Sequence, residues 1–568
     1  MPGIILTSRI APERVETAAQ QLKFTPSYSH ETHISEDELT LISNRYDNYP
    51  IRQFKVDELH FYFEGYIYNR SDEDVINEVK SALLDSKYDV LANKISSYDG
   101  EFFMIVVNKQ KQIVHLFNDS WGRLPVYIYE NEQEKIVSRE IKFITSIVDQ
   151  LNYDPISVAN NLMFGYSLGH KTIWQGVRKM APHSIITIDL NSNKLGDRNF
   201  FDLKFNNENN SKDELAEEIL QKIETSLDHR IQKLPQPSLS LSGGLDSRLI
   251  AACLKKINRS IPLTTYSSYD QSTNPDIKSG SQIVKQLGFE NLHELIPLRN
   301  TEIKDLFLLA DIKQGLNFLG MSFIIPYYQY LSDKNYSTIT GDGGDKFLVD
   351  LTPPKKIKSE QQLINCILKY NSTCSIEEAA QLANVTPKEI IDHLKTHLNN
   401  YPVEDYNLKY AHFIVKERGI NWLFEGEDRN RYFSWSTSPF YNPELIQLCL
   451  KYPMNAKRYG QLFLKLFNKL PGNLASILNP NWMLPLNDQK GIKRLHFKQN
   501  LKMYIPNILL SSLAKTNLDT FVYRDLLKEQ LVKKSDTEII NQTVVENITC
   551  SSTLYWRMLT LLIQNRAN

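Results

Sequence analysis

The chain has 568 residues, of which 42% are hydrophobic and 23% charged, and its formal net charge is −1. The length predicts two to four domains, and the near-zero charge excludes a global attraction to nucleic acid or to an anionic membrane. Five cysteines are scattered without CxxC spacing, which favours reduced thiols over a disulfide framework or a zinc site. The first residues lack the apolar core of a signal peptide, and no apolar run approaches membrane-spanning length. We therefore expect a cytoplasmic protein.

The first 200 residues are rich in predicted strands. Short β-branched and aromatic runs, broken by Gly, Asp and Asn, predict strands at 61–69, 101–108, 112–119, 124–130 and 183–190. Helical periodicity predicts helices at 72–84 and 155–168. The polar stretch 204–214 has no periodic apolar residues, and we interpret it as a linker.

From residue 215 onward, strand–helix alternation gives way to mostly helix. A helix-rich insert at about 351–405 opens with TPPKK, and within it residues 375–394 have a helix-turn-helix pattern. A DNA-reading unit would carry a basic face, and this segment has none. We interpret the insert as a small helical lid or spacer.

The stretch 239–254, LSLSGGLDSRLIAACL, carries the strongest functional signal. Its surroundings predict a buried strand, a glycine turn and a helix, at 237–242, 243–244 and 245–256. The first N–H groups of a helix have no internal partner and lie at the positive end of its dipole. Glycines let an anion approach such a turn closely, and Ser242 and Ser247 add hydroxyl donors. The pattern indicates a phosphate site.

Asp246 lies in the same turn, where a carboxylate would repel phosphate. A divalent cation between them removes the conflict, because Mg²⁺ is commonly held by one or two carboxylates together with phosphate oxygens. The structural alternative is a strand–turn–helix corner with Asp246 as a first-turn dipole partner. That alternative explains the glycines but not two serines and an acid in this order. A Walker A loop and a dinucleotide fingerprint are excluded, because neither GK[ST] nor GxGxxG is present.

The motif S-G-G-x-D-S after a strand resembles the pyrophosphate loop of AMP-forming ATP enzymes, and the chain as a whole resembles asparagine synthetases. The family's second signature, usually S-G-E-G-x-D-E, is similar to TGDGGDKF at 340–347. Weaker similarities to its glutaminase and synthetase domains lie at 63–70, 98–129, 172–189, 274–295 and 427–448.

The resemblance implies an α/β protein in two parts. Residues 1–203 would form a glutaminase-like αββα sandwich of the Ntn-hydrolase type, and 204–214 the linker. Residues 215–568 would form a pyrophosphate-loop α/β synthetase domain with a largely helical remainder.

The resemblance also implies ATP and Mg²⁺ as ligands. The residues that would hold the β- and γ-phosphates are Ser242, Gly243, Gly244 and Ser247, and those that would bind Mg²⁺ are Asp246 and Asp345. The remaining nucleotide-binding set, mostly around the adenosine, is Leu241, Tyr266, Ser267, Thr340 and Gly341. From the residues alone, 340–347 predicts a strand that ends in a Gly-rich turn with two acids. Such a turn could close a metal–nucleotide site. The alternatives are a calcium-like turn and a tight acidic turn without a ligand.

The N-terminal part departs from the family in its catalytic residues. Glutamine-using members begin, after Met removal, with a nucleophilic Cys, whereas residue 2 here is Pro2 and no cysteine lies in residues 1–200. The family's N-G-E-I-Y-N loop, whose Asn helps to form the oxyanion hole, is here EGYIYN at 64–69. Without nucleophile and donor, we interpret this domain as an inactive scaffold.

The synthetase part also departs from the pattern. Asn481 stands where a lysine that steadies departing pyrophosphate is expected, and Lys490, Lys493 or Arg494 could supply that charge. Further replacements are Asp342 for the usual Glu, Lys346 for the usual second acid, and residues 435–437 for the usual E-x-R. These changes gather around the acceptor rather than around ATP, which favours an unusual acceptor.

The sequence therefore predicts an ATP- and Mg²⁺-dependent ligase. A carboxylate would attack the α-phosphorus of ATP to give an acyl-adenylate and pyrophosphate, and an amine would then displace AMP. Proximity and electrostatics would carry most of the catalysis. The candidate bases for a protonated amine are Asp342, Glu425 and Glu427, and a solvated or ion-paired acid is the alternative for each, favoured for the two glutamates.

Family members without the N-terminal Cys include β-lactam synthetases and lasso peptide cyclases, in which amine and carboxylate belong to one molecule. The chain length and helical insert favour a peptide, so we expect macrolactam formation, with a precursor peptide and its processing protease as partners and neither nucleic acid nor membrane. The alternatives are an ammonia-dependent asparagine synthetase, a β-lactam-synthetase-like enzyme, or a non-catalytic scaffold, which Asn481 and Trp435 favour. A tRNA-modifying enzyme would need paired redox cysteines and a basic face, and the sequence has neither.

Overall fold

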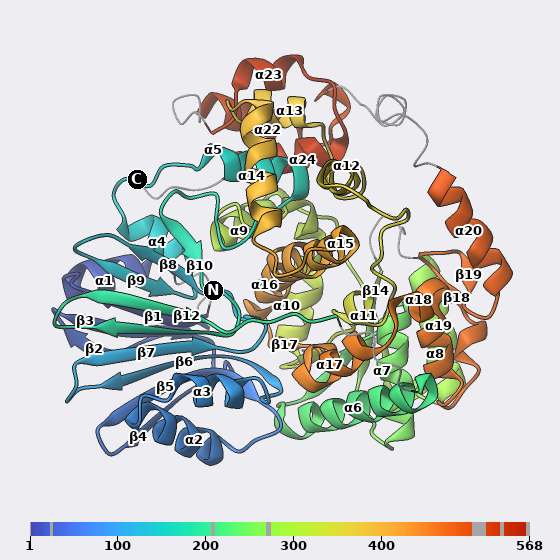
Figure 1. The fold of residues 1–568 in the computed structure, drawn as a ribbon, viewed down its shortest axis with the longest axis horizontal. Helices are drawn as coiled ribbons and strands as arrows, with labels where there is room; N and C mark the ends of the chain where they lie inside the picture. Colours follow the sequence, from blue (N-terminus) through green and yellow to red (C-terminus); the bar gives the residue numbers. More distant parts are fainter. Residues whose placement is uncertain are drawn as a thin grey trace.

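The computed structural model describes residues 2–22, 27–205, 211–267, 274–501, 518–533 and 539–563. Two stacked six-stranded antiparallel sheets occupy the first 200 residues (Figure 1). The first has the order β10-β8-β9-β1-β3-β2, with bounds Val177–Lys179, Tyr127–Glu130, Lys135–Ser138, Gly3–Ser8, Leu39–Arg45 and Ser29–Glu36. The second has the order β12-β11-β7-β6-β5-β4, with bounds Lys194–Asn199, Ser184–Asp189, Ile113–Asn118, Gly100–Asn108, Leu59–Ile67 and Ile51–Val56.

Side-chain alternation along the strands builds the layers. In β6, Phe103 and Ile105 enter the core between the sheets, while Phe102 and Met104 join a separate core with the helices on the outer face. Successive strand residues point to opposite faces, so each apolar strand serves two cores. The covering helices are α2 (Asp72–Leu84) and α3 (Tyr88–Ile95) on the second sheet, and α1 (Pro12–Gln20) and α4 (Ile141–Ile147) on the first. The result is the expected αββα sandwich.

The second half is built on a five-stranded parallel sheet, so the α/β prediction is confirmed. Its order is β15-β14-β13-β16-β17, with bounds His293–Pro297, Leu263–Ser267, Pro237–Ser240, Ser337–Ile339 and Ser436–Thr437. The helices between its strands are α7 (Leu245–Lys256), α8 (Asn274–Leu287), α9 (Ile303–Lys313) and α10 (Ile325–Asp333), and α6 (Lys212–Lys233) precedes it. The chain leaves β13 toward β14 and β15 and returns to the other side as β16. Ligands of open α/β sheets bind at such a switch point.

Most of the remainder is helical. The insert holds α12 (Glu360–Asn371), α13 (Ile376–Leu382) and α14 (Pro387–Asn399). After it come α15 (Tyr406–Phe413), a π-helix η3 (Ile414–Leu423), α16 (Phe424–Arg431), α17 (Pro443–Lys451), α18 (Met454–Lys457), α19 (Gln461–Phe467), the hairpin β18–β19 (Leu478–Asn479 and Leu484–Pro485), α20 (Gln489–Leu501), α22 (Arg524–Lys533), α23 (Gln542–Asn547) and α24 (Ser552–Leu562). Helices α13 and α14 of the insert pack on α5 (Pro155–Phe164), and the insert shares a core with α24 (Figure 1). Its role as a lid or spacer stays a prediction.

The helices predicted at 72–84 and 245–256 match their observed bounds, and the predicted strands lie within three residues of theirs. The helix predicted at 155–168 is wrong at its end. It stops at Phe164 because Gly165 adopts a left-handed conformation, with φ of 87°, that caps the helix. Residues 206–210 of the predicted linker lie outside the described residues, and α6 begins inside its predicted range. In the part of the chain that the structure describes, no helix is long and apolar enough to cross a membrane.

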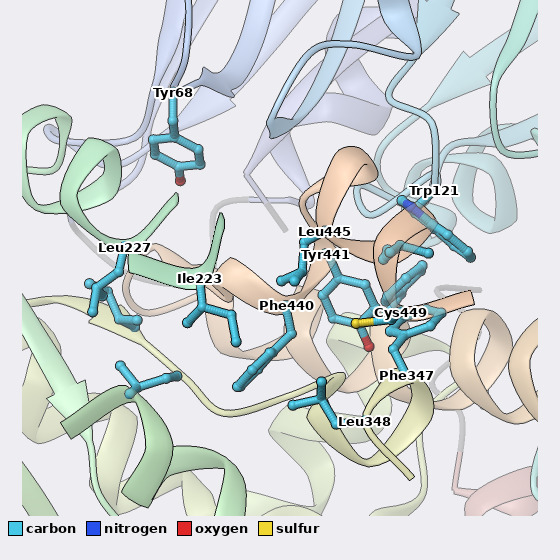
Figure 2. Close-up of a cluster of buried hydrophobic side chains, with 14 of the residues drawn as sticks. Tyr68, Trp121, Ile223, Leu227, Phe347, Leu348, Phe440, Tyr441, Leu445 and Cys449 are labelled. Carbon is cyan, nitrogen blue, oxygen red and sulfur yellow. The ribbon is translucent and has the colours of Figure 1, made fainter. Parts of the chain in front are cut away.

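The two halves bury a common core (Figure 2). Tyr68 and Trp121 come from the sandwich and lie beside residues of α6, α11 (Gly344–Phe347) and α17. The Trp121 ring centroid is 5.3 Å from that of Phe347, which in turn is 6.1 Å from that of Tyr441. The loop that follows β16 is therefore packed directly against the sandwich.

Candidate functional site

The predicted phosphate turn lies between β13 and α7 and is stabilised by hydrogen bonds among its own residues. The Ser242 amide donates to Ser247 Oγ at 3.1 Å, and the two hydroxyl oxygens are 3.0 Å apart. The Gly244 amide donates to Ser242 Oγ at 3.2 Å. Helix α7 begins at Leu245, as predicted, so its N-terminus opens onto this turn. The two serines thus shape the loop as well as offering hydroxyls to a ligand.

The hairpin after Leu478 covers the turn closely. A Cβ on Gly243 would lie 2.6 Å from Pro480 Cγ, which is closer than side chains allow, so glycine is required there. Arg248 fastens the two parts, because its Nη2 donates to the carbonyls of Gly243 at 2.6 Å and Leu478 at 3.0 Å. Asn481, the residue in the place of the expected lysine, is exposed in this hairpin. The covering segment is thus at the loop, although its expected cation is missing.

The second predicted loop, between β16 and α11, touches the first. A Cβ on Gly341 would lie 2.7 Å from the Ser247 amide nitrogen and 2.9 Å from Asp246 Cβ. Gly344 likewise lies against the Asp246 carboxylate. Thr340 Oγ1 donates to Asp342 Oδ2 at 3.2 Å and orients that acid. Residues almost 100 positions apart therefore form one site at the switch point of the sheet.

This site holds more negative than positive charge. Asp246 Oδ1 is shielded from solvent, and no described residue forms a hydrogen bond with it. Burial, with the nearby charge of Asp345, raises the pKa of Asp246 well above its usual range. Burial, with the charges of Glu427 and Asp345, raises the pKa of Asp342 to about 6.

The residues present fit a divalent cation. Lys346 forms an ion pair with Asp345 and is buried, and it is the nearby cation that opposes the rise of the Asp246 pKa. In the described ranges no group of three His, Cys, Asp or Glu side chains could hold a metal alone. Asp246 and Asp345 would therefore hold Mg²⁺ only together with ligand oxygens, which is its usual manner of binding beside phosphates.

The predicted adenosine side lies at the carboxyl ends of β13 and β14. The Leu241 amide donates to the Thr264 carbonyl at 2.8 Å, which keeps Leu241 beside β14 beyond the end of its own strand. The Tyr266 ring centroid is 5.1 Å from that of Tyr327, and Ser267 is the last residue of β14. The structure thus brings Leu241, Tyr266 and Ser267 to the same edge as the phosphate turn.

Asp276 at the start of α8 was missed by the sequence analysis. Its Oδ1 accepts a hydrogen bond from the Gly243 amide at 3.0 Å, and burial raises its pKa. The amide that it occupies belongs to the turn that would meet a phosphate. In the sequence, Asp276 is an acid within the weakly similar segment 274–295, and no local pattern indicates that it contacts the phosphate turn.

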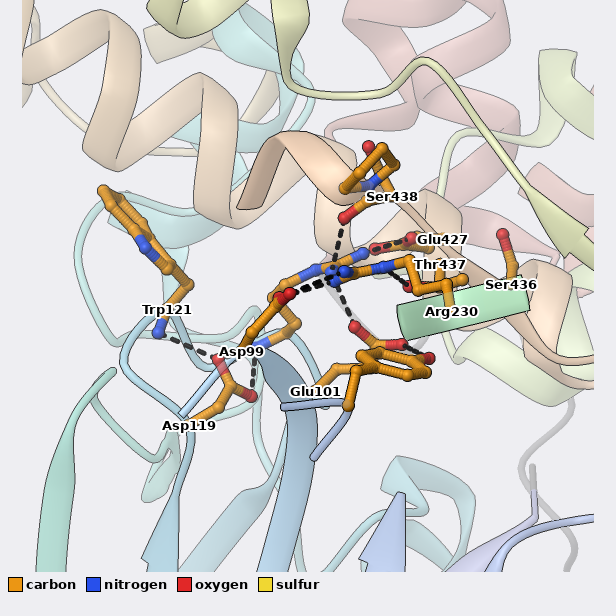
Figure 3. Close-up of polar contacts among 12 residues, drawn as sticks. Asp99, Glu101, Asp119, Trp121, Arg230, Glu427, Ser436, Thr437 and Ser438 are labelled. Carbon is orange, nitrogen blue, oxygen red and sulfur yellow. Dashed lines mark hydrogen bonds and ion pairs between the residues drawn. The ribbon is translucent and has the colours of Figure 1, made fainter. Parts of the chain in front are cut away.

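The two glutamates proposed as bases lie in buried ion pairs between the halves. Figure 3 shows Glu427 beside Glu101. Arg123 binds Glu101 at 2.6 Å and Glu427 at 2.5 Å. Glu425 binds Lys313 at 2.6 Å and accepts from the Tyr127 hydroxyl. Both glutamates are thus ion-paired acids, which was the alternative to a catalytic base. Glu427 is nevertheless close enough to Asp342 to raise the pKa of Asp342.

Lys490 and Lys493 lie on α20, which packs on the turn Arg458–Gly460 rather than on the phosphate turn. Both side chains are exposed, and Lys493 Nζ lies 5.9 Å from the Tyr459 ring centroid. The structure therefore does not bring these two lysines to the carboxylates of the site.

In the sandwich, the expected oxyanion-hole position holds a paired acid. Glu64 accepts from the Ile4 amide at 2.9 Å and from Arg139 Nε at 2.8 Å. Arg139 Nη2 donates a hydrogen bond to Asp428 Oδ1 of the second half at 2.6 Å. A carboxylate committed to this bridge replaces the amide donor that glutamine hydrolysis would need.

Comparison with known proteins finds one matching family in the part of the chain that holds the site. Residues 218–349 match the asparagine synthase family, and this segment contains both loops described above. The segment is therefore an asparagine synthase family domain.

Particular relatives are distant and match only in part. The chain is 24% identical over 235 residues to asparagine synthetase [glutamine-hydrolyzing] 1 of Bacillus subtilis, covering 41% of this chain and 36% of that protein. It is also 24% identical over 223 residues to the probable asparagine synthetase [glutamine-hydrolyzing] of Acanthamoeba polyphaga mimivirus, covering 36% of each. The chain thus spans about a third of the length of these relatives.

Among solved structures, the glutamine phosphoribosylpyrophosphate amidotransferase from B. subtilis matches with 10% identity and a TM-score of 0.26, over 71% of this chain and 95% of that one. The NMN synthetase from Francisella tularensis matches with 17% identity and a TM-score of 0.21, over 38% of this chain and 96% of that one.

Proposed function

We propose that the chain is an ATP-dependent, amide-forming ligase that adenylates a carboxylate and releases pyrophosphate and then AMP. One observation carries the proposal: Asp246, with a buried oxygen that no described residue satisfies, lies at a helix N-terminus between two glycine loops. Such an arrangement is unfavourable until a cation and an anion arrive together. A magnesium-bound nucleotide supplies both.

We assign each part of the reaction to the residues that lie nearest to it. The turn Ser242–Ser247 would hold phosphate oxygens on its amides and hydroxyls, and Asp246 with Asp345 would hold Mg²⁺, which screens the charge of the triphosphate. Asp342 would receive a proton from the attacking amine, because a pKa of about 6 suits a base that works near neutral pH. Leu241 and Tyr266 would line the base and ribose.

For the substrate, we propose that amine and carboxylate belong to one molecule, with a peptide macrolactam as the first choice. The Glu64–Arg139 pair in the sandwich supports an amine source other than glutamine. Trp435, which replaces a charged residue of the family, donates to the Tyr68 hydroxyl at 3.1 Å and is buried. A charged residue that the resemblance implies would thus be replaced by an aromatic one that packs against Tyr49 and Tyr66 of the sandwich.

The alternatives are an ammonia-dependent asparagine synthetase, a β-lactam-synthetase-like enzyme and a scaffold without turnover. The exposed Asn481 favours the scaffold, and the unsatisfied Asp246 favours an enzyme. Release of AMP and pyrophosphate from ATP in the presence of aspartate and ammonium would favour the synthetase. Loss of the mass of one water from a co-expressed precursor peptide, with no release of AMP from ATP in the presence of aspartate, would favour the cyclase.

The decisive experiment is calorimetric titration of the full chain with Mg·ATP. We expect micromolar binding by the wild type and a loss of at least about 100-fold, or about 2.7 kcal/mol, in Asp246→Asn. The matched control is Asp333→Asn, an exposed acid at the end of α10, which should bind like the wild type. Absence of binding by the wild type, or equal binding by Asp246→Asn, would overturn the proposed site.

A further inference from the structure

A second cavity lies far along the chain from the two glycine loops, between the sandwich and the insert. Its volume is about 370 Å³, which is the size of a small-molecule site. Three parts of the chain form its walls: the sandwich segments around Leu168 and Phe201, helix α14 with His393 and His397, and the π-helix η3 with Lys416. π-helical turns are rare and occur frequently at functional sites.

The acid in this cavity, Glu417, is fully engaged by the protein. Its carboxylate accepts from the Gly169 amide at 2.8 Å, from Asn421 Nδ2 at 3.0 Å and from the Tyr401 hydroxyl at 3.1 Å. His397 Nε2 lies 2.7 Å from Glu417 Oε1. Burial opposes ionisation of Glu417, but the His397 charge and these hydrogen bonds outweigh it and lower its pKa to about 2. The negative charge is therefore compensated internally.

The cation in this cavity, Lys416, feels the charges of Glu417 and Asp202 only from beyond ion-pair distance. Its Nζ lies 5.2 Å from the Phe201 ring centroid and 5.5 Å from the Tyr401 ring centroid, so two aromatic rings hold it in place. No described residue forms a hydrogen bond or an ion pair with this ammonium group. The other lysine of the wall, Lys171, is paired with Asp154 at 3.0 Å.

A second polar atom is also unsatisfied. His393 Nε2 is shielded from solvent and has no hydrogen-bond partner among the described residues. Its side chain lines the same cavity as Lys416, and the apolar part of the wall is formed by Leu168, Phe201 and Ile420. A buried polar atom without a partner costs free energy, and a ligand in the cavity would recover it only if the His393 ring turned toward it.

We propose that this cavity binds a small organic anion, with its charged group at Lys416 and its apolar body against Phe201 and Ile420. The unpaired ammonium selects the charge, and the aromatic and aliphatic wall selects a carboxylate on a ring or chain over a bare inorganic ion. This inference does not rest on the proposed ligase activity, because the cavity shares no lining residue with the glycine loops.

The test uses benzoate, inorganic phosphate and benzylamine as probes, titrated into the full chain by calorimetry without nucleotide. We expect benzoate to bind the wild type with a Kd below about 1 mM, and phosphate and benzylamine to bind at least about tenfold more weakly. Lys416→Met should weaken benzoate binding at least about tenfold, and Lys416→Arg should retain it. The matched control, Lys334→Met, removes an ammonium that lies 5.8 Å from the Tyr330 ring elsewhere on the surface and should change nothing.

Three results would overturn the proposal. They are no benzoate binding by the wild type, equal binding by wild type and Lys416→Met, and phosphate binding without benzoate binding. Asp246→Asn should bind benzoate like the wild type, which separates this test from that of the nucleotide site. If Lys416→Met does not fold, as judged by its thermal midpoint, Ile420→Trp takes its place, because it fills the apolar wall and should abolish benzoate binding.

Discussion

Two clusters of buried acids in this molecule differ in how their charge is balanced. In the network between the halves, each acid meets a cation: Glu64 and Asp428 meet Arg139, and Glu101 and Glu427 meet Arg123. At the glycine loops, Asp246 and Asp342 have raised pKa values, and the nearest lysine is already paired with Asp345. The first cluster is complete without a ligand, and the second is not. Incomplete charge balance, rather than burial of acids, distinguishes the candidate site from the network between the halves.

The largest effect should follow from breaking the balanced cluster. Arg139→Met leaves Glu64 and Asp428 buried without their shared cation, which should cost about 3–5 kcal/mol in the free energy of unfolding measured with urea. The control Arg14→Met removes a partly exposed arginine paired with Glu134 and should cost less than about 1 kcal/mol. Similar losses in both variants would mean that the network contributes no more than a surface pair.

The unbalanced cluster should make nucleotide binding depend on pH. A cation binds the ionised carboxylates, and the raised pKa values of Asp246 and Asp342 mean that protons must leave first. We expect the affinity for Mg·ATP to fall at least about tenfold, or about 1.4 kcal/mol, between pH 8 and pH 5. Calorimetry in buffers of different ionisation enthalpy would detect the released protons. An affinity that does not change over this range would contradict the charge deficit.

A smaller effect concerns stability without Mg²⁺. The folded-state pKa of Asp342 is raised to about 6, above the unfolded value of about 3.9, so its stabilising contribution is complete below pH 4 and is lost as pH rises through 6. Buried histidines with lowered pKa values, such as His115, act in the opposite sense below pH 6.5. The thermal midpoint of the wild type should therefore fall more, or rise less, between pH 5 and pH 8 than that of Asp342→Asn, by about 1 °C. Parallel curves would contradict the shift.

A further prediction concerns Lys346, the lysine paired with Asp345. Lys346→Met removes the ammonium paired with Asp345, so a metal ion should meet less competition there. We expect the Mg²⁺ concentration that gives half of the thermal stabilisation to fall a few-fold, while the apo protein becomes less stable by about 1–3 kcal/mol. Weaker Mg²⁺ binding by this variant would show that Lys346 assists the ligand instead.

Local patterns in the sequence predicted the elements and loops that depend on neighbouring residues. The bounds of α2 and α7 were predicted to the residue, because their caps and apolar periodicity lie within the segment itself. The glycine turns were predicted because few other uses fit serine, glycine and aspartate in that order.

Contacts between distant segments were beyond the reach of the sequence. Arg123 and Glu427 are 304 positions apart, and nothing local marks them as partners. The same holds for Asp276 and the Gly243 amide, and for the covering of that turn by Pro480. The ten-residue π-helix was also unforeseen, because its apolar pattern resembles that of an ordinary helix.

That π-helix determines how the helical segments before and after it are rotated relative to each other. Tyr406 to Arg431 form three successive helical segments, with Glu417 facing the cavity at the insert and Glu427 and Asp428 facing the arginines of the sandwich. Each residue of an α-helix turns the chain by about 100°. Deleting one residue within 414–423 would rotate one end relative to the other by about that angle. The π-helix therefore sets the rotation between the two ends of this helical stretch, so that Glu417 faces the cavity while Glu427 and Asp428 face the arginines of the sandwich.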